Sequence, residues 1–217
     1  MTDERPFVHD PVLVDLVVEL FAPVPAGTIV DATLGGAGHA AAVLQSRPDL
    51  RVLGLDRDRN ALAAAQARLA PFGPRAEAHH ARFDQLATVV AAAGTASQPI
   101  VGVLFDLGVS SPQFDDADRG FSYRHDAPLD MRMDQSTGMS AADVVNDLDE
   151  RELAGILRRN ADERFAGRIA RAIIAARPIA TTGELADVVV AAIPAPARRT
   201  GGFPAKRTFQ ALRIHVN

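Results

Sequence analysis

Short apolar runs alternate with helical segments along the first half of the chain. Strands are predicted at residues 28–30, 52–55, 76–81 and 100–105. Helices are predicted around them, at residues 9–21, 37–45 and 60–69 and from residue 83 onward. Strands separated by helices of this length are typical of βαβ units, so the pattern predicts an α/β fold with a parallel sheet and right-handed crossovers.

From Ser140 onward the pattern becomes purely helical. Segments that begin at Ser140 and Thr181 resemble capping boxes, in which a hydroxyl residue and an acid three positions later satisfy each other's backbone amides. Residues 162–176 predict an amphipathic helix that ends at Pro178. Its apolar face carries Phe165, Ile169 and Ile173, and its polar face carries Arg164, Arg168 and Arg171.

The stretch from Asp106 to Asp134 shows almost no helical or strand periodicity. Its 29 residues follow the fourth predicted strand and include seven aspartates, two prolines and two glycines. A loop this long inside a compact domain is usually functional. Because open α/β sheets bind ligands beyond the carboxyl ends of their strands, the stretch predicts an enzyme site.

The end of the chain is unusual. Residues 208–217 begin an amphipathic helix, but no C-cap glycine follows. In addition, the fourth strand would leave an apolar sheet edge, which invites aggregation unless another segment covers it. We therefore expect the sequence to be a C-terminally truncated form of a longer protein.

Composition narrows the class of protein. The absence of cysteine excludes disulfides and thiolate metal sites and fits a reducing cytosol. The N-terminus has no apolar signal segment, and no apolar run approaches the roughly 20 residues that span a membrane. We therefore expect a soluble, cytoplasmic protein. No metal is required, since the aspartates lack the spacing of a calcium-binding loop.

Charge is divided unevenly along the chain. Residues 1–150 contain 11 Lys and Arg against 22 Asp and Glu, a net charge of −11, whereas residues 151–217 contain 12 against 5, a net charge of +7. Such asymmetry can mark a nucleic-acid-binding half, or it can reflect solvated, arginine-rich helix faces, and charge alone leaves both open. The candidate phosphate contacts, with a solvated basic loop as the alternative, are Arg198, Arg199, Lys206 and Arg207.

A glycine-rich turn follows the first predicted strand and opens a helix. Its glycines permit a tight turn and a close approach of the backbone to a ligand at the helix N-terminus. Gly36, Gly38 and Ala41 match the dinucleotide pattern GxGxx[G/A], which is weak evidence by itself. Asp56 ends the second strand about 20 residues further on, where an acid can accept both hydroxyls of a cofactor ribose. Together these features predict a nucleoside-containing cofactor.

Acids at the strand ends separate two cofactor classes that both fit this turn. Asp31 precedes the glycines, where it would repel the pyrophosphate of a nicotinamide cofactor but could face a cationic amino-acid group. Together with Asp56 and Asp106 it forms a ring of strand-end carboxylates that suits the sulfonium of S-adenosylmethionine. The acids therefore favour a methyltransferase, and an NAD-dependent oxidoreductase is the less favoured alternative.

Six segments resemble the bacterial RsmH/MraW family, whose members methylate the N4 amino group of a cytosine in the decoding region of 16S ribosomal RNA. They are HxPVL (9–13), DATLGGAGH (31–39), GLDRD (54–58), the aspartate-rich stretch (106–134), ERFAGRIARAI (163–173) and RTFQALRIHVN (207–217). They follow the family's order, and the aspartate-rich stretch is nearly diagnostic. The resemblance implies a class I S-adenosylmethionine-dependent methyltransferase fold, a Rossmann-like parallel sheet that is incomplete here, with an inserted all-helical subdomain.

The resemblance also implies site residues. Cofactor contacts are assigned to Ala37, Gly38, His39, Asp56, Phe83, Asp106 and Gln113. Ala37 stands where the family often has glycine, which is tolerable if its backbone keeps an ordinary φ. Assistance to the poorly nucleophilic cytosine amine is assigned to Asp106, Ser110, Ser111 and Pro112. An unpaired or flipped base could stack on Phe114, Phe121 or Tyr123, unless these rings pack the loop against the body.

These interpretations divide the chain into four segments. They are the cofactor-binding core (1–110), an active-site loop region (111–139), the inserted helical subdomain (140–205) and the start of a helix that returns to the core (206–217). The implied partner is 16S ribosomal RNA within the small ribosomal subunit, with no membrane, and a homodimer stays open. The alternative is a non-catalytic fragment that binds the cofactor weakly or not at all.

Overall fold

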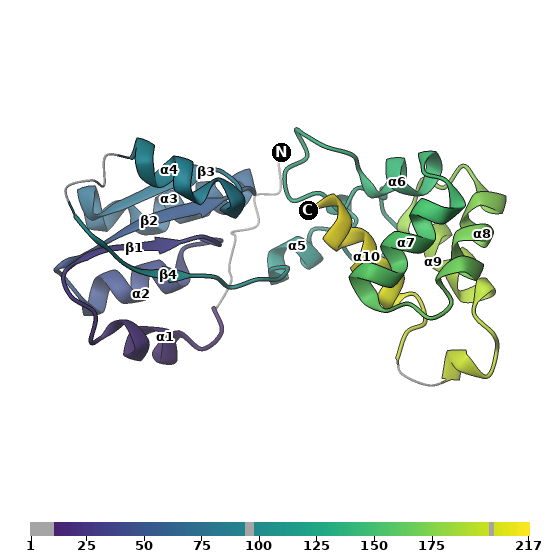
Figure 1. Cartoon of the computed structure of the whole chain (residues 1–217), viewed down its shortest axis with the longest axis horizontal. Coiled ribbons are helices and arrows are strands. Elements are labelled where there is room, and N and C mark those ends of the chain that lie inside the picture. The colour runs from purple at the N-terminus through teal and green to yellow at the C-terminus, as the bar shows by residue number, and fades with distance from the viewer. Residues whose placement is uncertain (1–10, 94–97, 200–201) are drawn as a thin grey trace. The chain divides into compact units, whose positions relative to one another are not determined.

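The computed structural model describes residues 11–93, 98–199 and 202–217 (Figure 1). The chain divides into two compact units, Met1–Pro112 and Gln113–Asn217, and each unit has its own core. The predicted start of the first helix at residue 9 lies outside the described residues, as do His9 and Asp10 of the HxPVL segment.

The first unit is the parallel α/β sheet that the alternation of apolar runs and helices predicts. Its strand order is β3-β2-β1-β4. The strands are β1 (Gly27–Asp31), β2 (Leu50–Asp56), β3 (Ala76–His80) and β4 (Ile100–Leu104). The helices are α1 (Val14–Phe21), α2 (Gly38–Ser46), α3 (Arg59–Leu69) and α4 (Leu86–Ala92), with the short 3-10 helices η1 (Ala70–Arg75) and η2 (Phe83–Gln85). The predicted strands and helices are confirmed, with their ends shifted by a few residues.

Different helices cover the two faces of the sheet. Successive strand residues point to opposite faces, so Ile29 packs with residues of α1, α2 and α3, whereas Val30 packs with residues of α4. β1 is buried along its whole length because it pairs with β2 on one side and with β4 on the other. The core of the unit therefore lies at β1 and β2.

β4 is an edge of this sheet. Among the described residues it pairs with β1 alone. Ile100, Val103 and Phe105 expose 40%, 45% and 49% of their surface. An edge strand presents unpaired backbone N–H and C=O groups on its outer side, so β4 combines free hydrogen-bonding groups with apolar side chains, as the sequence predicts.

The aspartate-rich stretch contains two short helices that the sequence does not predict. They are α5 (Ser111–Asp115) and η4 (Ala117–Arg119). One or two helical turns are too short for a periodic apolar pattern to emerge. The expectation of a loop without secondary structure is therefore wrong for these residues.

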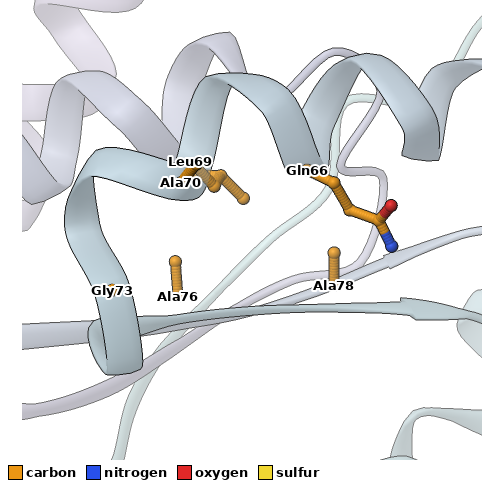
Figure 2. Close-up of a pocket in the computed structure, with 6 residues that line it drawn as sticks. All are labelled: Gln66, Leu69, Ala70, Gly73, Ala76 and Ala78. Carbon is orange, nitrogen blue, oxygen red and sulfur yellow. The ribbon is translucent and has the colours of Figure 1, made fainter.

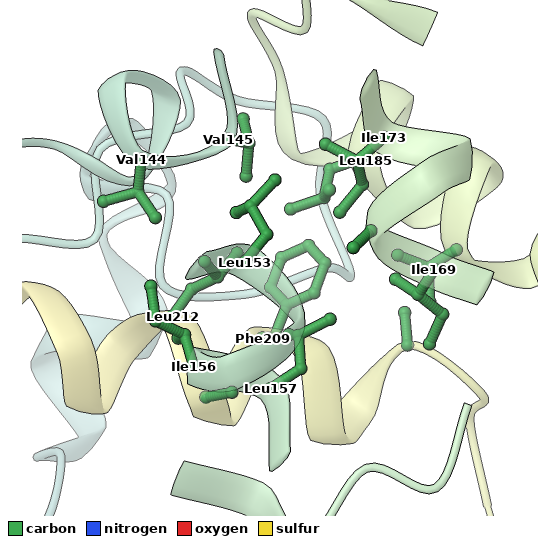
Figure 3. Packing of buried hydrophobic residues seen from close by; sticks show 14 of the residues in the cluster. Val144, Val145, Leu153, Ile156, Leu157, Ile169, Ile173, Leu185, Phe209 and Leu212 are labelled. Atoms are coloured by element: carbon green, nitrogen blue, oxygen red, sulfur yellow. The ribbon is translucent and has the colours of Figure 1, made fainter. Parts of the chain in front are cut away.

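The second unit consists of helices around one apolar core (Figure 3). Its main helices are α6 (Ala141–Asp147), α7 (Glu150–Ala161), α8 (Ala166–Ala176), α9 (Thr182–Ala192) and α10 (Lys206–Val216), with the 3-10 helix η5 (Ala197–Arg199). The predicted capping boxes are confirmed at Ser140 and Thr181. Ile169 and Ile173 of α8 are fully buried, as the amphipathic pattern predicts. α8 begins later than predicted because Asp162 adopts a left-handed conformation and ends α7.

Helix α10 is part of this helical core. Phe209 and Leu212 are fully buried among residues of α7 and its neighbours (Figure 3). The Phe209 ring also meets the Tyr123 ring edge to face, with a centroid distance of 5.4 Å. The division of the chain into four segments remains a prediction. The sequence leads us to expect that the last helix returns to the cofactor-binding core. In the structure, α10 packs against α7 and α6.

The C-terminal turn of α10 holds the aspartate-rich stretch in place. Arg213 Nη1 donates to the Phe121 carbonyl oxygen at 2.8 Å, although the two residues are 92 positions apart. The Asn217 side chain donates to the Met131 carbonyl and accepts from the Met133 N–H, both at 2.7 Å. The loop is therefore fixed by hydrogen bonds from the far end of the chain.

Gly120→Ala is expected to destabilise the second unit by more than about 3 kcal/mol. Gly120 has a φ of +66°, and a Cβ there would overlap the Pro128 carbonyl oxygen, which is backbone and cannot rotate away. Urea unfolding of the purified chain measures the loss. Gly138→Ala is the matched control. Gly138 also has a positive φ, +76°, but the space around it is open. Its substitution should therefore lower stability only by the backbone strain of a left-handed alanine, about 1 kcal/mol. Equal losses in the two variants would contradict the steric argument.

Candidate functional site

A tight turn connects the end of β1 to α2. Gly35 and Ala37 both adopt left-handed conformations, with φ of +52° and +60°. Glycine does so freely, whereas the Cβ of alanine makes this conformation unfavourable by about 1–2 kcal/mol. From the sequence, alanine is accepted at position 37 on the condition that its φ is ordinary, and the structure does not meet that condition. Ala37 is the N-cap residue of α2, so its left-handed backbone sets the start of that helix at Gly38.

The Asp56 carboxylate fixes this turn from the end of the neighbouring strand β2. Its Oδ2 accepts the Gly35 N–H at 2.7 Å, and its Oδ1 accepts the Asp58 N–H at 2.8 Å. Burial raises the pKa of Asp56, and these two hydrogen bonds act against that rise. A carboxylate has about four lone-pair sites, so both oxygens keep capacity to accept further hydrogen bonds from a ligand.

Asp31 is the most buried acid of the site, with 2% of its surface exposed. The pKa of its carboxyl is raised to about 7, chiefly by burial and also by the charges of Asp56 and Asp106. The Thr33 N–H, which donates to Asp31 Oδ1 at 3.2 Å, and the nearby His39 ring both lower this pKa. A bound cation would also favour the charged carboxylate. The site is therefore suited to a positively charged ligand.

Gly38 and His39 contact the segment that precedes α1. His39 Nε2 lies 2.7 Å from the Val12 carbonyl oxygen, so Nε2 must carry the proton that it donates. A Cβ on Gly38 would lie 2.5 Å from Pro11 Cγ. The sequence predicts a glycine here because a ligand approaches the backbone. The structure adds a second reason, which is that Pro11 occupies the space of a side chain.

Phe83 and Phe105 form an exposed aromatic pair on the face of the sheet that carries α4. Their ring centroids are 6.1 Å apart at an interplanar angle of 82°. Phe83 exposes 48% of its surface, which excludes the alternative that it is a core residue. Phe105 is absent from the predicted site because its place in an apolar strand gives no signal that its ring is exposed. The pair presents aromatic surface that could contact a planar base.

Asp106 lies two residues after Leu104, the last residue of the edge strand β4. Its N–H donates to Thr33 Oγ1 at 2.7 Å, which joins the segment after β4 to the turn after β1. Its side chain is exposed. Asp31, Asp56 and Asp106 thus gather at one edge of the sheet, as the sequence predicts from their positions after parallel strands.

The remaining predicted site residues lie on and before α5. Ser110 and Pro112 are half-buried, and Ser111 is the exposed first residue of the helix. Gln113 is buried, with 5% of its surface exposed, and belongs to the second unit. Their roles beside the strand-end acids remain predictions.

The candidate base-stacking rings differ in exposure. Phe121 is fully buried, so this ring packs the loop against the body and is not available to a base. Tyr123 stacks on Phe203 at a centroid distance of 4.5 Å. Phe114 is 36% exposed, and the Arg213 guanidinium lies 5.2 Å from its ring centroid. Phe114 is therefore the most accessible of the three predicted rings.

Two of the four candidate phosphate contacts, Arg198 and Arg207, already donate hydrogen bonds within the second unit. Arg198 donates to the Ile193 and Ala191 carbonyl oxygens at 2.7 Å and 3.1 Å. Arg207 Nη1 donates to the Asp162 carbonyl oxygen at 2.7 Å. Lys206 is exposed, and the Arg199 side chain lies outside the described part of the chain. Arg198 is thus engaged in holding the loop to the end of α9.

A small cavity lies elsewhere in the first unit, between α3, η1 and β3 (Figure 2). Its volume is about 130 Å³, and its lining residues are Gln66, Leu69, Ala70, Gly73, Ala76 and Ala78. None of the predicted site residues lines it. The cavity is apolar apart from the Gln66 amide, and it offers no chemistry related to the strand-end acids.

The described residues, 11–93, 98–199 and 202–217, contain no helix that is both long and apolar enough to cross a membrane. In the same part of the chain, no three His, Cys, Asp or Glu side chains are grouped so that they could hold a metal ion.

The parallel four-stranded sheet with its flanking helices belongs to the class I methyltransferase fold. This class transfers a methyl group from a donor cofactor. The chain belongs to the MraW methylase family, whose family model matches residues 6–217.

Curated relatives agree with this assignment. A protein of Symbiobacterium thermophilum named "Ribosomal RNA small subunit methyltransferase H" is 53% identical over 215 residues, which cover 97% of this chain and 67% of the relative. Proteins with the same name from Mycolicibacterium smegmatis and Frankia alni are 54% and 55% identical; the matches cover 100% and 97% of this chain and 61% and 66% of those relatives. The chain thus spans between 61% and 67% of the length of these three proteins.

Asp31→Asn is expected to flatten the pH dependence of stability between about pH 4 and 7. Because the pKa of Asp31 in the folded chain, about 7, is above its ordinary value of 3.8, the folded chain binds more protons in this window than the unfolded chain does. Stability is therefore lost as the pH rises through it. An asparagine stays neutral, so the variant should unfold at a higher temperature than the parent at pH 8 and at a similar temperature near pH 4.

Asp49→Asn is the control for this measurement. Asp49 is an exposed acid whose pKa is lowered by its hydrogen bond with Arg47. Its replacement should therefore lower the stability of the chain above that pKa. This effect is opposite in sign to the one expected for Asp31→Asn. Thermal unfolding followed by circular dichroism at several pH values compares the variants. An unchanged pH slope in Asp31→Asn would show that this carboxyl is not buried in its neutral form.

Proposed function

We propose that this chain binds S-adenosylmethionine at the strand ends and contributes to methylation of the N4 amino group of a cytosine in 16S ribosomal RNA. Family membership and the names of the curated relatives support the reaction and the class of substrate. The observation that carries the cofactor is the cluster of Asp31, Asp56 and Asp106 around the turn after β1.

The charge of this cluster fits a cationic cofactor. Asp31 carries a raised pKa of about 7 because it is buried beside other acids. A sulfonium and an ammonium group would neutralise these charges, whereas the pyrophosphate of a nicotinamide cofactor would add negative charge to the same space. The cluster therefore favours S-adenosylmethionine over the NAD-dependent alternative.

The residues proposed as cofactor contacts are given the following roles. Asp56 has acceptor capacity left on both oxygens for ribose hydroxyls. Phe83, with Phe105 behind it, presents an exposed ring for the adenine. Asp31 would lie toward the cationic amino-acid part. The backbone of Ala37, Gly38 and His39 forms the turn itself, and Gln113 is proposed as a further contact.

The cofactor, when bound, supplies an electrophilic methyl group for an in-line displacement. The chain's own contribution is position and electrostatics. Asp106 is exposed and can accept an N–H of the cytosine amine, which would orient the nitrogen lone pair. Ser110, Ser111 and Pro112 are proposed to line the place of the target base. The base must be unpaired or flipped to reach it, and Phe114 offers an accessible ring for stacking.

The proposed partner is 16S ribosomal RNA in the small ribosomal subunit, which would place the activity in the cytoplasm. The chain spans 67% or less of the relatives' length, so a second candidate remains a fragment that binds the cofactor weakly and does not catalyse transfer. A homodimer also stays a proposal without structural support.

Asp56→Ala is expected to weaken binding of S-adenosylhomocysteine by about 10- to 100-fold, because hydrogen bonds to a charged acceptor contribute about 1.5–3 kcal/mol. Isothermal titration calorimetry on the 217-residue chain measures the change, with thermal unfolding in parallel to separate loss of the site from loss of the fold. Asp49→Ala, an exposed acid remote from the turn, should leave the affinity unchanged.

Three outcomes separate the candidate functions. Binding of S-adenosylhomocysteine but not of NAD supports the proposal, and the reverse would sink it. If this chain shows no detectable binding of S-adenosylhomocysteine while a full-length relative binds it, the second candidate, a non-catalytic fragment, is supported. Methyl transfer to small subunits from a strain that lacks the enzyme, with mass analysis of the cytosine, then tests the reaction itself.

A further inference from the structure

Two arginines lie on α8 and a third lies in the turn that precedes it. Arg168 and Arg171 are three residues apart, which places them on the same side of the helix, and Arg164 lies in the preceding turn. All three are exposed, whereas Ile169 and Ile173 on the opposite side are fully buried. They belong to the ERFAGRIARAI segment, to which the proposed cofactor site assigns no role.

A fourth arginine reaches this surface from α7. Arg158 Nη2 lies 3.5 Å from the position that a Cβ on Gly167 would occupy. Gly167 is three residues after Arg164 and four before Arg171, and the Arg171 Nε donates to its carbonyl oxygen at 3.2 Å. The guanidinium groups of Arg158 and Arg171 therefore both approach Gly167. The Arg164 guanidinium lies 5.0 Å from the centroid of the neighbouring Phe165 ring. We call Arg158, Arg164, Arg168 and Arg171 the α7–α8 arginine surface.

This surface has few acids to balance it. Glu150 forms an ion pair with Arg171 at 3.2 Å. Over the described ranges of the chain, Arg158, Arg164 and Arg168 form no ion pair. Asp162 is exposed nearby, but Glu163 is buried and its carboxylate accepts the Phe165 N–H at 2.9 Å. Clustered cations without partners repel one another and attract an anion.

Apolar surface is lacking beside these cations. The exposed large apolar residues of the second unit, as far as the structure describes it, are Phe114, Met139, Phe203 and Ile214, and none of them lies on α7 or α8. A helix that binds a membrane surface combines cations with apolar side chains that enter the lipid. A cationic surface without such side chains fits a polyanion in water better than a bilayer.

We propose that the α7–α8 arginine surface binds the phosphates of an RNA backbone. This proposal rests on the proposed function, because that function makes RNA the substrate. Guanidinium groups pair with phosphate oxygens through two parallel hydrogen bonds. Such contacts orient the RNA and carry no sequence information. The surface would therefore supply affinity, while the choice of base is made elsewhere.

The test compares RNA binding by two double variants of equal charge. Arg164→Gln with Arg168→Gln removes two unpaired cations of the surface. Arg51→Gln with Arg82→Gln removes two cations of the first unit that are paired with Glu77 and Asp84. The probe is a short fluorescein-labelled single-stranded RNA of mixed sequence, and fluorescence anisotropy at several salt concentrations gives the affinity and its salt dependence.

The surface variant should bind about 10- to 30-fold more weakly near 0.1 M salt, and the slope of log K against log salt should become shallower by about 1.4, since each phosphate contact to a single strand contributes about 0.7. The control variant should bind like the parent. Arg164→Lys with Arg168→Lys keeps both charges and should retain most of the slope. Unfolding temperatures of all variants confirm that the helices remain folded.

Equal losses in the surface and control variants would overturn the proposal, because net charge alone would then explain binding. An unchanged affinity in the surface variant would overturn it as well. Vesicles with anionic headgroups form a second arm, and loss of vesicle binding with intact RNA binding would assign the surface to a membrane instead. Cofactor calorimetry on the same variants should be unaffected, so failure of the cofactor site and failure of this surface are distinguished.

Discussion

Parallel pairing of β1 with a strand on each side is the constraint on which the candidate site depends. The register places Asp31 opposite Gly54 of β2 and Leu104 of β4. All three strands therefore end at the same edge, and the acids that follow them are brought together although they are far apart in sequence. The same pairing buries β1 completely, so the first of these acids has almost no contact with water.

The turn after β1 contains residues in energetically unfavourable states. A left-handed Ala37 and a neutral-leaning Asp31 are both unfavourable features of the isolated chain. Asp56 holds the turn by accepting the Gly35 and Asp58 N–H groups, although its charge adds to the rise in the pKa of Asp31. Strained backbone and buried charge are tolerated at sites where a ligand repays them. Under the proposed function, the turn is therefore organised for the cofactor before the cofactor binds.

The aspartate-rich stretch obtains its shape in a different way. Its sequence gives little local preference, and the contacts that fix it come from α10 through Arg213 and Asn217. Arg119, which is buried, adds a hydrogen bond to the Met133 carbonyl oxygen at 2.7 Å. The resemblance of residues 207–217 to a family segment thus has a structural explanation within the second unit, because those residues hold the loop that carries the proposed substrate side of the site.

Periodicity and capping residues were sufficient to predict the strands, most helices and the parallel sheet, because these depend on local patterns. The acids at the strand ends were predictable for the same reason, since each directly follows an apolar run. Ala37, Phe105 and the short helix α5 were not. The φ of Ala37 depends on a hydrogen-bonded turn closed by Asp56, and the exposure of Phe105 depends on which strands pair with β4. No local pattern encodes contacts of that kind.

The acidic cluster and the α7–α8 arginine surface suit the two kinds of ligand that the proposals assign to the chain. The acids at the strand ends lie in the first unit, where a sulfonium cofactor would be attracted, and the α7–α8 arginine surface lies in the second unit, where a polyanion would be attracted. A single patch of either sign could not serve both, because the charge that binds one ligand repels the other. Separation of the two charges between two folding units allows each to be strong without weakening the other.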